Sequence, residues 1–260
     1  MSKSAAPPKV GKKAQRRIEQ LRKKRRQKIM LWLAVITTLC AVVIAIKVVP
    51  YMSDLISFKK EKLSPFDSEY LEINSDYVGW LKIDNTSIDF PVVRGLDNEK
   101  YLKTTFRGEN NILGSIFMDY RCIGNNLQHM IIYGHQAGDT ATNKKLMFGE
   151  LTDFLDKQYL AEHPIIMYLE NDTIFEFEIF SARMSDTNDP AFYLDFSTQD
   201  SFPAFLKRNN APADATKIIT LSTCVGANND RRMIVQGVLK NAVTVKPEYG
   251  ENGWNMVRQN

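Results

Sequence analysis

Three side chains with complementary chemistry stand at the ends of predicted strands. The thiol of Cys224 closes an apolar run that begins at Ile218. The imidazole of His135 closes a second run that begins at His129, and the guanidinium of Arg232 opens the stretch that follows Cys224. A thiol with a pKa of about 8.5 needs a basic or cationic neighbour to react as a thiolate. A permanently charged arginine can stabilise an oxyanion, so this set is suited to cysteine acyl transfer.

Cys224 has a simpler alternative reading, because a buried free cysteine often serves only as a small apolar side chain. Two features favour chemistry instead. Alternation along a strand places Cys224 on the same face as Ser222, Thr220 and Ile218, so it emerges where that face has become polar. The residues after it form a loop rich in Gly and Asn, the kind of segment that carries function.

The three histidines occupy different settings. His163 precedes Pro164 after a helical segment and is expected on the surface, and His129 opens a strand as a partly buried spectator. His135 ends its strand just before the polar loop 136–143. Its side chain can project into a cleft, which makes it the candidate acid or base.

Two arginines compete for the role of the cation. Arg231 and Arg232 are neighbours on a strand and must face opposite ways. Alternation with the apolar residues that follow does not decide between them, and an ion pair with Asp230 is the structural alternative for either one.

Cysteine usage and motif content narrow the chemistry further. Cys40, Cys122 and Cys224 form an odd, irregularly spaced set, which argues against a disulfide framework. The sequence has no Gly-rich phosphate loop and no His/Cys cluster at ligand spacing, so we expect no metal and no other cofactor.

The N-terminal region predicts a membrane anchor. Residues 1–28 form a basic tail that accounts for the net charge of +4, so the acidic remainder does not suggest a nucleic-acid partner. Residues 29–46 carry no charge and are long enough to span a bilayer. A cleaved signal peptide is the alternative, but the basic segment is too long and no clean small-residue cleavage pattern follows. We predict a retained signal anchor at 29–49, with a cytoplasmic N-terminus and the remainder extracellular.

The residue pattern of the rest of the chain predicts a mainly β (α+β) domain. A juxtamembrane and helical segment, 50–76, precedes it, with a short helix at 66–74. Two further helices are predicted at 146–155 and 198–208, the latter capped by Ser197. Eight strands are predicted, and they are 78–83, 88–93, 114–119, 129–134, 165–169, 173–183, 218–223 and 233–240. They predict a closed or nearly closed barrel over residues 77–240 with peripheral helices, followed by a polar extension, 241–260.

Several segments resemble the sortase family, and class B in particular. Thr220 to Cys224 resembles the TLxTC signature, Tyr133 to His135 the histidine segment, and Asp230 to Met233 the arginine strand. The lead-in 74–81, the Asp119 to Arg121 segment and the predicted helix at 198–208 are similar to class B. The resemblance covers residues 64–240 and implies a closed eight-stranded sortase-type β-barrel.

The resemblance also implies residue roles. Cys224 would be the nucleophile, His135 the general acid/base, and Arg232, not Arg231, the oxyanion or substrate-carbonyl contact. The residues implied to line the substrate groove are Asn98, Leu102, Tyr133 and Ser222. Specificity is expected to depend on the loop 186–196. One departure is Val225, where class B relatives often have a polar or acidic residue.

The function implied is that of a Gram-positive cysteine transpeptidase. It would cleave a C-terminal sorting motif of surface proteins through a thioester and pass the acyl group to an amine of a peptidoglycan cross-bridge or a pilin. A membrane-anchored cysteine protease, which transfers the acyl group to water, uses the same residues. A surface-displayed binding or pilus-structural module with an incidental cysteine is the alternative from another class.

Overall fold

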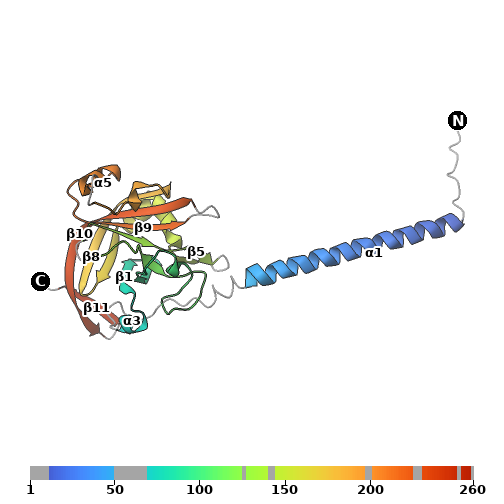
Figure 1. Cartoon of the computed structure of the whole chain (residues 1–260), viewed down its shortest axis with the longest axis horizontal. Coiled ribbons are helices and arrows are strands. Elements are labelled where there is room, and N and C mark those ends of the chain that lie inside the picture. Colours follow the sequence, from blue (N-terminus) through green and yellow to red (C-terminus); the bar gives the residue numbers. More distant parts are fainter. Residues whose placement is uncertain are drawn as a thin grey trace. The chain divides into compact units, whose positions relative to one another are not determined.

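The computed structural model describes residues 12–49, 69–124, 127–139, 144–196, 201–224, 230–250 and 253–258 (Figure 1). The chain divides into two compact units, residues 1–56 and 57–260. Part of the predicted juxtamembrane segment, residues 50–68, lies outside the described residues.

The first unit contains one long helix. Helix α1 (Lys12–Val43) continues into the π-helical turn η1 (Ile44–Val48). Within it, Glu19–Ile46 is long and apolar enough to cross a membrane, and its side chains are exposed, including Leu31 at 69% and Trp32 at 67%. The hydroxyls of Thr37 and Thr38 both donate to the backbone oxygen of Ala34 and so need no water. An apolar surface of this kind is compatible with a membrane anchor.

The second unit is a closed barrel of eight strands with mixed direction, as predicted. The strands are β1 (Tyr77–Ile83), β2 (Asp89–Val93), β3 (Ile116–Met118), β4 (His129–Tyr133), β7 (Ile165–Glu170), β8 (Thr173–Asp186), β9 (Ile218–Cys224) and β10 (Arg231–Gly250). They follow the order β10-β8-β7-β1-β2-β3-β4-β9, and pairing of β9 with β10 closes the ring. The pairs β2–β3 and β4–β9 are parallel, whereas the others are antiparallel.

β10 is longer than the sequence predicted. It does not end at Lys240 but pairs with β8 as far as Thr244 and then forms a hairpin with β11 (Gly253–Arg258). Register shifts after Gln236 and after Leu239 let the strand bend and remain paired along this length. Much of the segment predicted as a polar extension is therefore strand.

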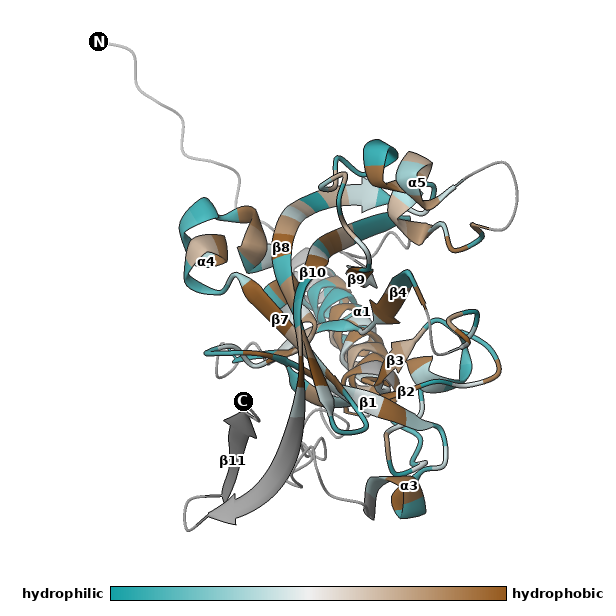
Figure 2. Ribbon diagram, turned by 90° about the vertical axis from the view of Figure 1, so that its left-hand side faces the viewer, coloured by the Kyte–Doolittle hydropathy of each residue, from teal (hydrophilic) through white to brown (hydrophobic). Residues whose placement is uncertain are grey.

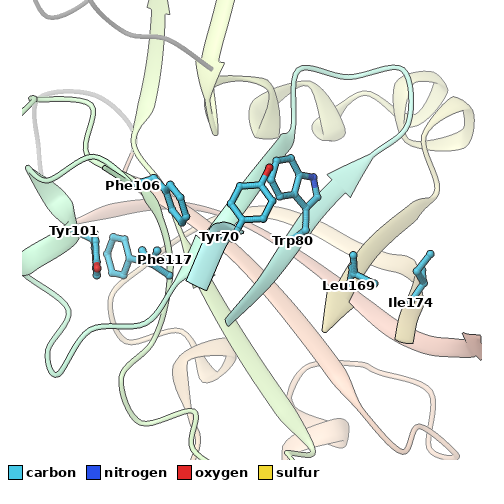
Figure 3. Close-up of a cluster of buried hydrophobic side chains, with 8 residues drawn as sticks. Tyr70, Trp80, Tyr101, Phe106, Phe117, Leu169 and Ile174 are labelled. Carbon is cyan, nitrogen blue, oxygen red and sulfur yellow. The ribbon is translucent and has the colours of Figure 1, made fainter. Parts of the chain in front are cut away.

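Figure 2 shows apolar segments in several strands, among them β4 and β7. On β9, Ile219 and Leu221 are fully buried on one face, and Ile218 is buried on the other face in a cluster with Phe202, Phe205 and Leu206. A second apolar cluster is built around helix α3 (Glu69–Ile73), the observed form of the predicted helix at 66–74 (Figure 3). Its Tyr70 ring lies 5.0 Å from the ring of Tyr77 and 5.2 Å from that of Trp80.

The helix predicted at 146–155 is correct only from Gly149 on, where it is a 3-10 helix. Its first residues form β6 (Lys144–Met147), which pairs with β5 (Gln136–Asp139), and the 3-10 helix η3 (Gly149–Leu155) follows. Met147 has a φ of 52°, and the Phe148 N–H donates to the His135 carbonyl at 2.9 Å, so the chain turns sharply between the two elements. The apolar positions are still buried, except Leu155, which is 48% exposed.

The second predicted helix is correct but shorter. α5 spans Phe202–Arg208 and has Ser201 at its N-cap, while the predicted cap, Ser197, lies outside the described residues. Another helix, α4 (Lys157–Glu162), was not predicted. It begins at Asp156, whose carboxylate accepts two backbone N–H groups of the first turn. The short 3-10 helices η2 (Lys100–Leu102) and η4 (Pro190–Phe192) complete the described elements.

His129 is fully buried in a polar network on the face of the sheet that α5 covers, and its ring lies 4.6 Å from that of Phe205. Its Nδ1 lies 2.9 Å from the carbonyl oxygen of Tyr193, so Nδ1 carries the proton, because a carbonyl only accepts. Its Nε2 therefore accepts from the Thr220 hydroxyl at 2.8 Å, and that hydroxyl accepts from the Gln236 side-chain amide at 3.1 Å. Burial lowers the pKa of His129 to about 4.

This low pKa predicts an acid-sensitive barrel. The unfolded chain binds a proton near pH 6.5 and the folded chain only near pH 4, so stability is complete above pH 6.5 and falls as the pH drops between these values. We expect a loss of about 3 kcal/mol, measured by urea unfolding of the full chain in detergent micelles from pH 7.5 to pH 4.

His129→Gln, which takes up no proton, should flatten this dependence. The buried carboxylates Asp119 and Asp189 have lowered pKa values and lose their contribution only below about pH 3.8. An unchanged slope in the variant would show that another group senses the pH.

Candidate active site

The strand register brings the predicted catalytic residues to one edge of the barrel. β4 and β9 run parallel, with Tyr133 opposite Ser222, and the Gly134 N–H donates to the Ser222 carbonyl at 3.2 Å. His135 and Cys224 each follow two residues beyond this pair, so both chains leave the sheet at the same end. On the other side of β9, the backbone of Cys224 pairs with that of Arg232. The structure describes Cys224 by its backbone alone, and Val225 lies outside the described residues.

A cavity of about 510 Å³ opens at this edge. Its lining residues are Asn98, Leu102, Phe117, Tyr133, Gly134, His135, Thr187, Phe192, Ser222, Thr223 and Arg232. Every site residue named from the sequence whose side chain is described is among them. Sequence reasoning did not single out Phe117, Thr187, Phe192 or Thr223, although two of these lie in the loop 186–196.

His135 is oriented by a backbone carbonyl. Its Nε2 lies 2.7 Å from the Leu102 oxygen, so Nε2 bears the proton and the neutral ring has its lone pair on Nδ1. Leu102 ends η2, where its N–H donates to the Glu99 carbonyl at 3.1 Å. A loop far away in sequence therefore fixes the imidazole, and no side-chain pattern could have revealed this contact.

Gly134 allows His135 to reach this position. A Cβ at residue 134 would lie 2.9 Å from the ring of Phe148 and would also collide with Ile116. Since real Cβ atoms do not approach a ring this closely, the close approach of β4's end to Phe148 requires glycine.

The two arginines occupy different environments. Arg232 lines the cavity, and its backbone pairs with both Cys224 and Ser185. The Arg231 side chain is exposed, and its backbone pairs with that of Asp186 on β8. The alternation of side chains thus aims Arg232 at the same space as His135.

Aromatic and amide groups form one wall of the cavity. The Tyr133 ring lies 5.4 Å from that of Phe117 and 6.4 Å from that of Phe192. Asn98 stands beside it and donates from Nδ2 to Asp119 at 3.0 Å. This wall offers stacking surfaces together with amide and hydroxyl groups, which suits an extended peptide.

Ser222 contributes a hydroxyl that is buried and has no hydrogen-bond partner among the described residues. Two positions earlier on the same face, the Thr220 hydroxyl is also buried but has partners in His129 and Gln236. An unsatisfied hydroxyl costs stability, whereas a paired one contributes to it.

We therefore expect Ser222→Ala to keep or raise the free energy of unfolding, by up to about 1 kcal/mol. Thr220→Val should lower it by about 1–3 kcal/mol, because it leaves the acceptor His129 Nε2 and the donor Gln236 Nε2 without their hydrogen-bond partner. Urea unfolding of both variants at pH 7.5 checks the contrast. Equal losses in the two variants would mean that the Ser222 hydroxyl has a structural partner.

Comparisons with known proteins agree with this geometry. A family model described as a sortase domain matches residues 81–240. Sortase B of Staphylococcus aureus is 34% identical over 199 residues, covering 72% of this chain and 80% of the relative. The structure of a Staphylococcus aureus sortase B–substrate complex superposes with a TM-score of 0.58 at 32% identity, covering 66% of this chain and 83% of that one. A sortase B structure complexed with triglycine gives a TM-score of 0.57 at 31% identity, with 68% and 84% covered. The chain therefore belongs to the sortase family, as a class B cysteine transpeptidase.

Proposed function

We propose that this chain cleaves a C-terminal sorting motif of surface proteins and joins the new carboxyl end to an amine. The convergence of the ends of β4 and β9 and the start of β10 on one cavity carries the proposal. In the first step, the Cys224 sulfur bonds to a threonyl carbonyl carbon and the peptide C–N bond breaks, leaving a thioester. In the second step, an amine nitrogen attacks the thioester and the thiol is restored.

His135 moves the protons in this scheme. The imidazole takes the proton of the thiol and gives it to the departing amine, then takes a proton from the incoming amine and returns it to sulfur. The Leu102 carbonyl supports both states, since it holds the ring in place and accepts a hydrogen bond from the protonated imidazole.

Arg232 stabilises the oxyanion or holds the substrate carbonyl. Its charge is permanent, and the pairing of its backbone with that of Cys224 supports a contact between the guanidinium and the developing oxyanion. Asn98, Leu102, Tyr133 and Ser222 line the cavity and form the groove for the motif.

The N-terminal unit supplies the location. The Lys and Arg residues of α1 precede its apolar part, which favours a cytoplasmic N-terminus and a barrel outside the membrane. There the barrel meets surface proteins that carry sorting motifs and an amine acceptor from a peptidoglycan precursor or a pilin. The triglycine bound to a relative supports a peptide amine as acceptor.

The test uses the full chain in detergent micelles. Its substrates are a quenched-fluorophore peptide library with one fixed threonine and randomised neighbours, with and without triglycine. We expect cleavage after threonine and, with triglycine present, a peptide–triglycine product detected by mass spectrometry. Hydrolysis that dominates and ignores triglycine would support the protease alternative.

Cys224→Ala addresses the binding-module alternative. This variant should form no product, and mass spectrometry of the peptide that carries residue 224 should show no modification by iodoacetamide, a readout that the exposed Cys40 does not enter. Cys122 does not confuse the readout, because it is buried and burial raises its pKa to about 11. Product formation that persists without the Cys224 thiol would remove the cysteine mechanism.

Arg231 and Arg232 provide a matched pair for the oxyanion role. We expect Arg232→Ala to lower kcat/KM by about a hundredfold to a thousandfold, as for loss of an oxyanion donor. Arg231→Ala should stay within about threefold of wild type, because this side chain is exposed and does not line the cavity. A larger loss in the Arg231 variant would reverse the assignment.

A further inference from the structure

Asp119 is a buried carboxylate directly after β3 that the catalytic scheme does not use. Its side chain is fully buried. The Arg121 side chain donates two hydrogen bonds to it, from Nε to Oδ1 at 2.9 Å and from Nη2 to Oδ2 at 2.8 Å. The Arg121 backbone N–H donates a third to Oδ1 at 3.0 Å. A paired arrangement of this kind fixes the direction of the carboxylate as well as its charge.

The same carboxylate reaches two residues of the cavity wall. Its Oδ2 accepts from Asn98 Nδ2 and from the Tyr133 hydroxyl, each at 3.0 Å. The Asn98 side-chain oxygen in turn accepts from the Tyr120 N–H at 3.0 Å. One buried group thus ties together the loop after β2, the loop after β3 and the end of β4.

We propose that Asp119 is a positioning residue that sets the orientation and hydrogen-bond polarity of Asn98 and Tyr133 for the substrate. This inference rests on the proposed function. Asp119 does not touch the reacting atoms. It acts through the two cavity residues that it holds.

Hydrogen-bond polarity makes the proposal specific. An ionised carboxylate only accepts, so the Tyr133 proton and one Asn98 amide proton are committed to Asp119. Tyr133 can then present only oxygen lone pairs to the cavity. The substrate group that meets this hydroxyl must be a donor, such as a backbone or side-chain N–H.

The charge state supports this polarity at neutral pH. Burial alone would raise the pKa of Asp119, but the hydrogen bonds and charge of Arg121 outweigh it and lower the pKa below its usual value. Burial and the neighbouring Asp119 charge raise the pKa of Tyr133, which therefore stays a donor.

Asp119→Asn tests the proposal, because it keeps the shape and replaces one acceptor oxygen with a donor. With the best library peptide of the wild-type full chain as substrate, we expect kcat/KM to fall about tenfold to a hundredfold, mainly through KM. The rate of Cys224 alkylation by iodoacetamide should stay within about twofold of wild type. A role in stability alone would change thermal unfolding and alkylation but would not produce this split.

Glu150→Gln is the matched control. Glu150 also binds a segment across the fold, since its carboxylate accepts from the N–H and the hydroxyl of Ser87, but it does not line the cavity. We expect its KM to remain at the wild-type value. If Asp119→Asn and Glu150→Gln change KM equally, or if Asp119→Asn leaves KM unchanged, the positioning role is overturned.

Arg121→Gln keeps the proposal testable if Asp119→Asn does not fold. The Arg121 side chain is 45% exposed, so its replacement leaves the buried Asp119 side chain itself unchanged, and thermal unfolding of the variant checks that it is folded. Without the Arg121 charge, the pKa of Asp119 should be higher than in wild type. As the pH is lowered, Asp119 is then protonated earlier, so the rise in KM should begin at a higher pH than in wild type. An unchanged pH profile of KM overturns the proposal. A wild-type chain that cleaves no library peptide overturns the proposed function, and this inference with it.

Discussion

The pairing of β9 on both of its edges is the constraint on which the site depends. β9 lies parallel to β4 and antiparallel to β10, and these two ladders close the barrel. These ladders bring the end of β4, the end of β9 and the start of β10, and with them the backbones of His135, Cys224 and Arg232, to one edge of the barrel. A slip of one residue in either ladder would turn alternate side chains to the opposite face and separate the three.

The face of β9 that carries Cys224 changes character along its length. Thr220 is buried and satisfied within the polar network of His129 and Gln236. Ser222, one step closer to the end, is buried but unsatisfied and borders the cavity. On this one face of the strand, a buried polar network is thus followed, two residues later, by the edge of the cavity.

Much of the barrel was predictable, because alternation of apolar and polar residues reports directly on strands. The failure at 146–155 has a physical cause. Met147, Leu151 and Phe154 are spaced as on a helix, yet a strand end with a positive φ followed by a 3-10 turn buries the same positions. Sequence periodicity records which residues are buried and does not record the backbone that buries them.

Less of the site than of the barrel could be predicted from the sequence. The resemblance pointed to residues that line the cavity, whereas side-chain alternation alone could not choose between Arg231 and Arg232. Their neighbours across β8 and β9 separate them. The Leu102 carbonyl and Asp119 act through contacts between segments far apart in sequence, for which a single sequence carries no local signal.

The residues that line the cavity are anchored by buried polar groups. Besides Asp119, the ion pair of Arg183 with Asp189 holds the loop that carries Thr187 and Phe192. Arg183 also donates to Gln236 at 2.8 Å, so this anchor joins the network of His129, which holds the carbonyl of Tyr193. Side chains fixed in this way before the substrate arrives lose little conformational entropy on binding. Under the proposed function, the cleft would select its peptide by the fit of preformed donors and acceptors, and a substitution in the buried polar network would alter specificity through the loop that it holds.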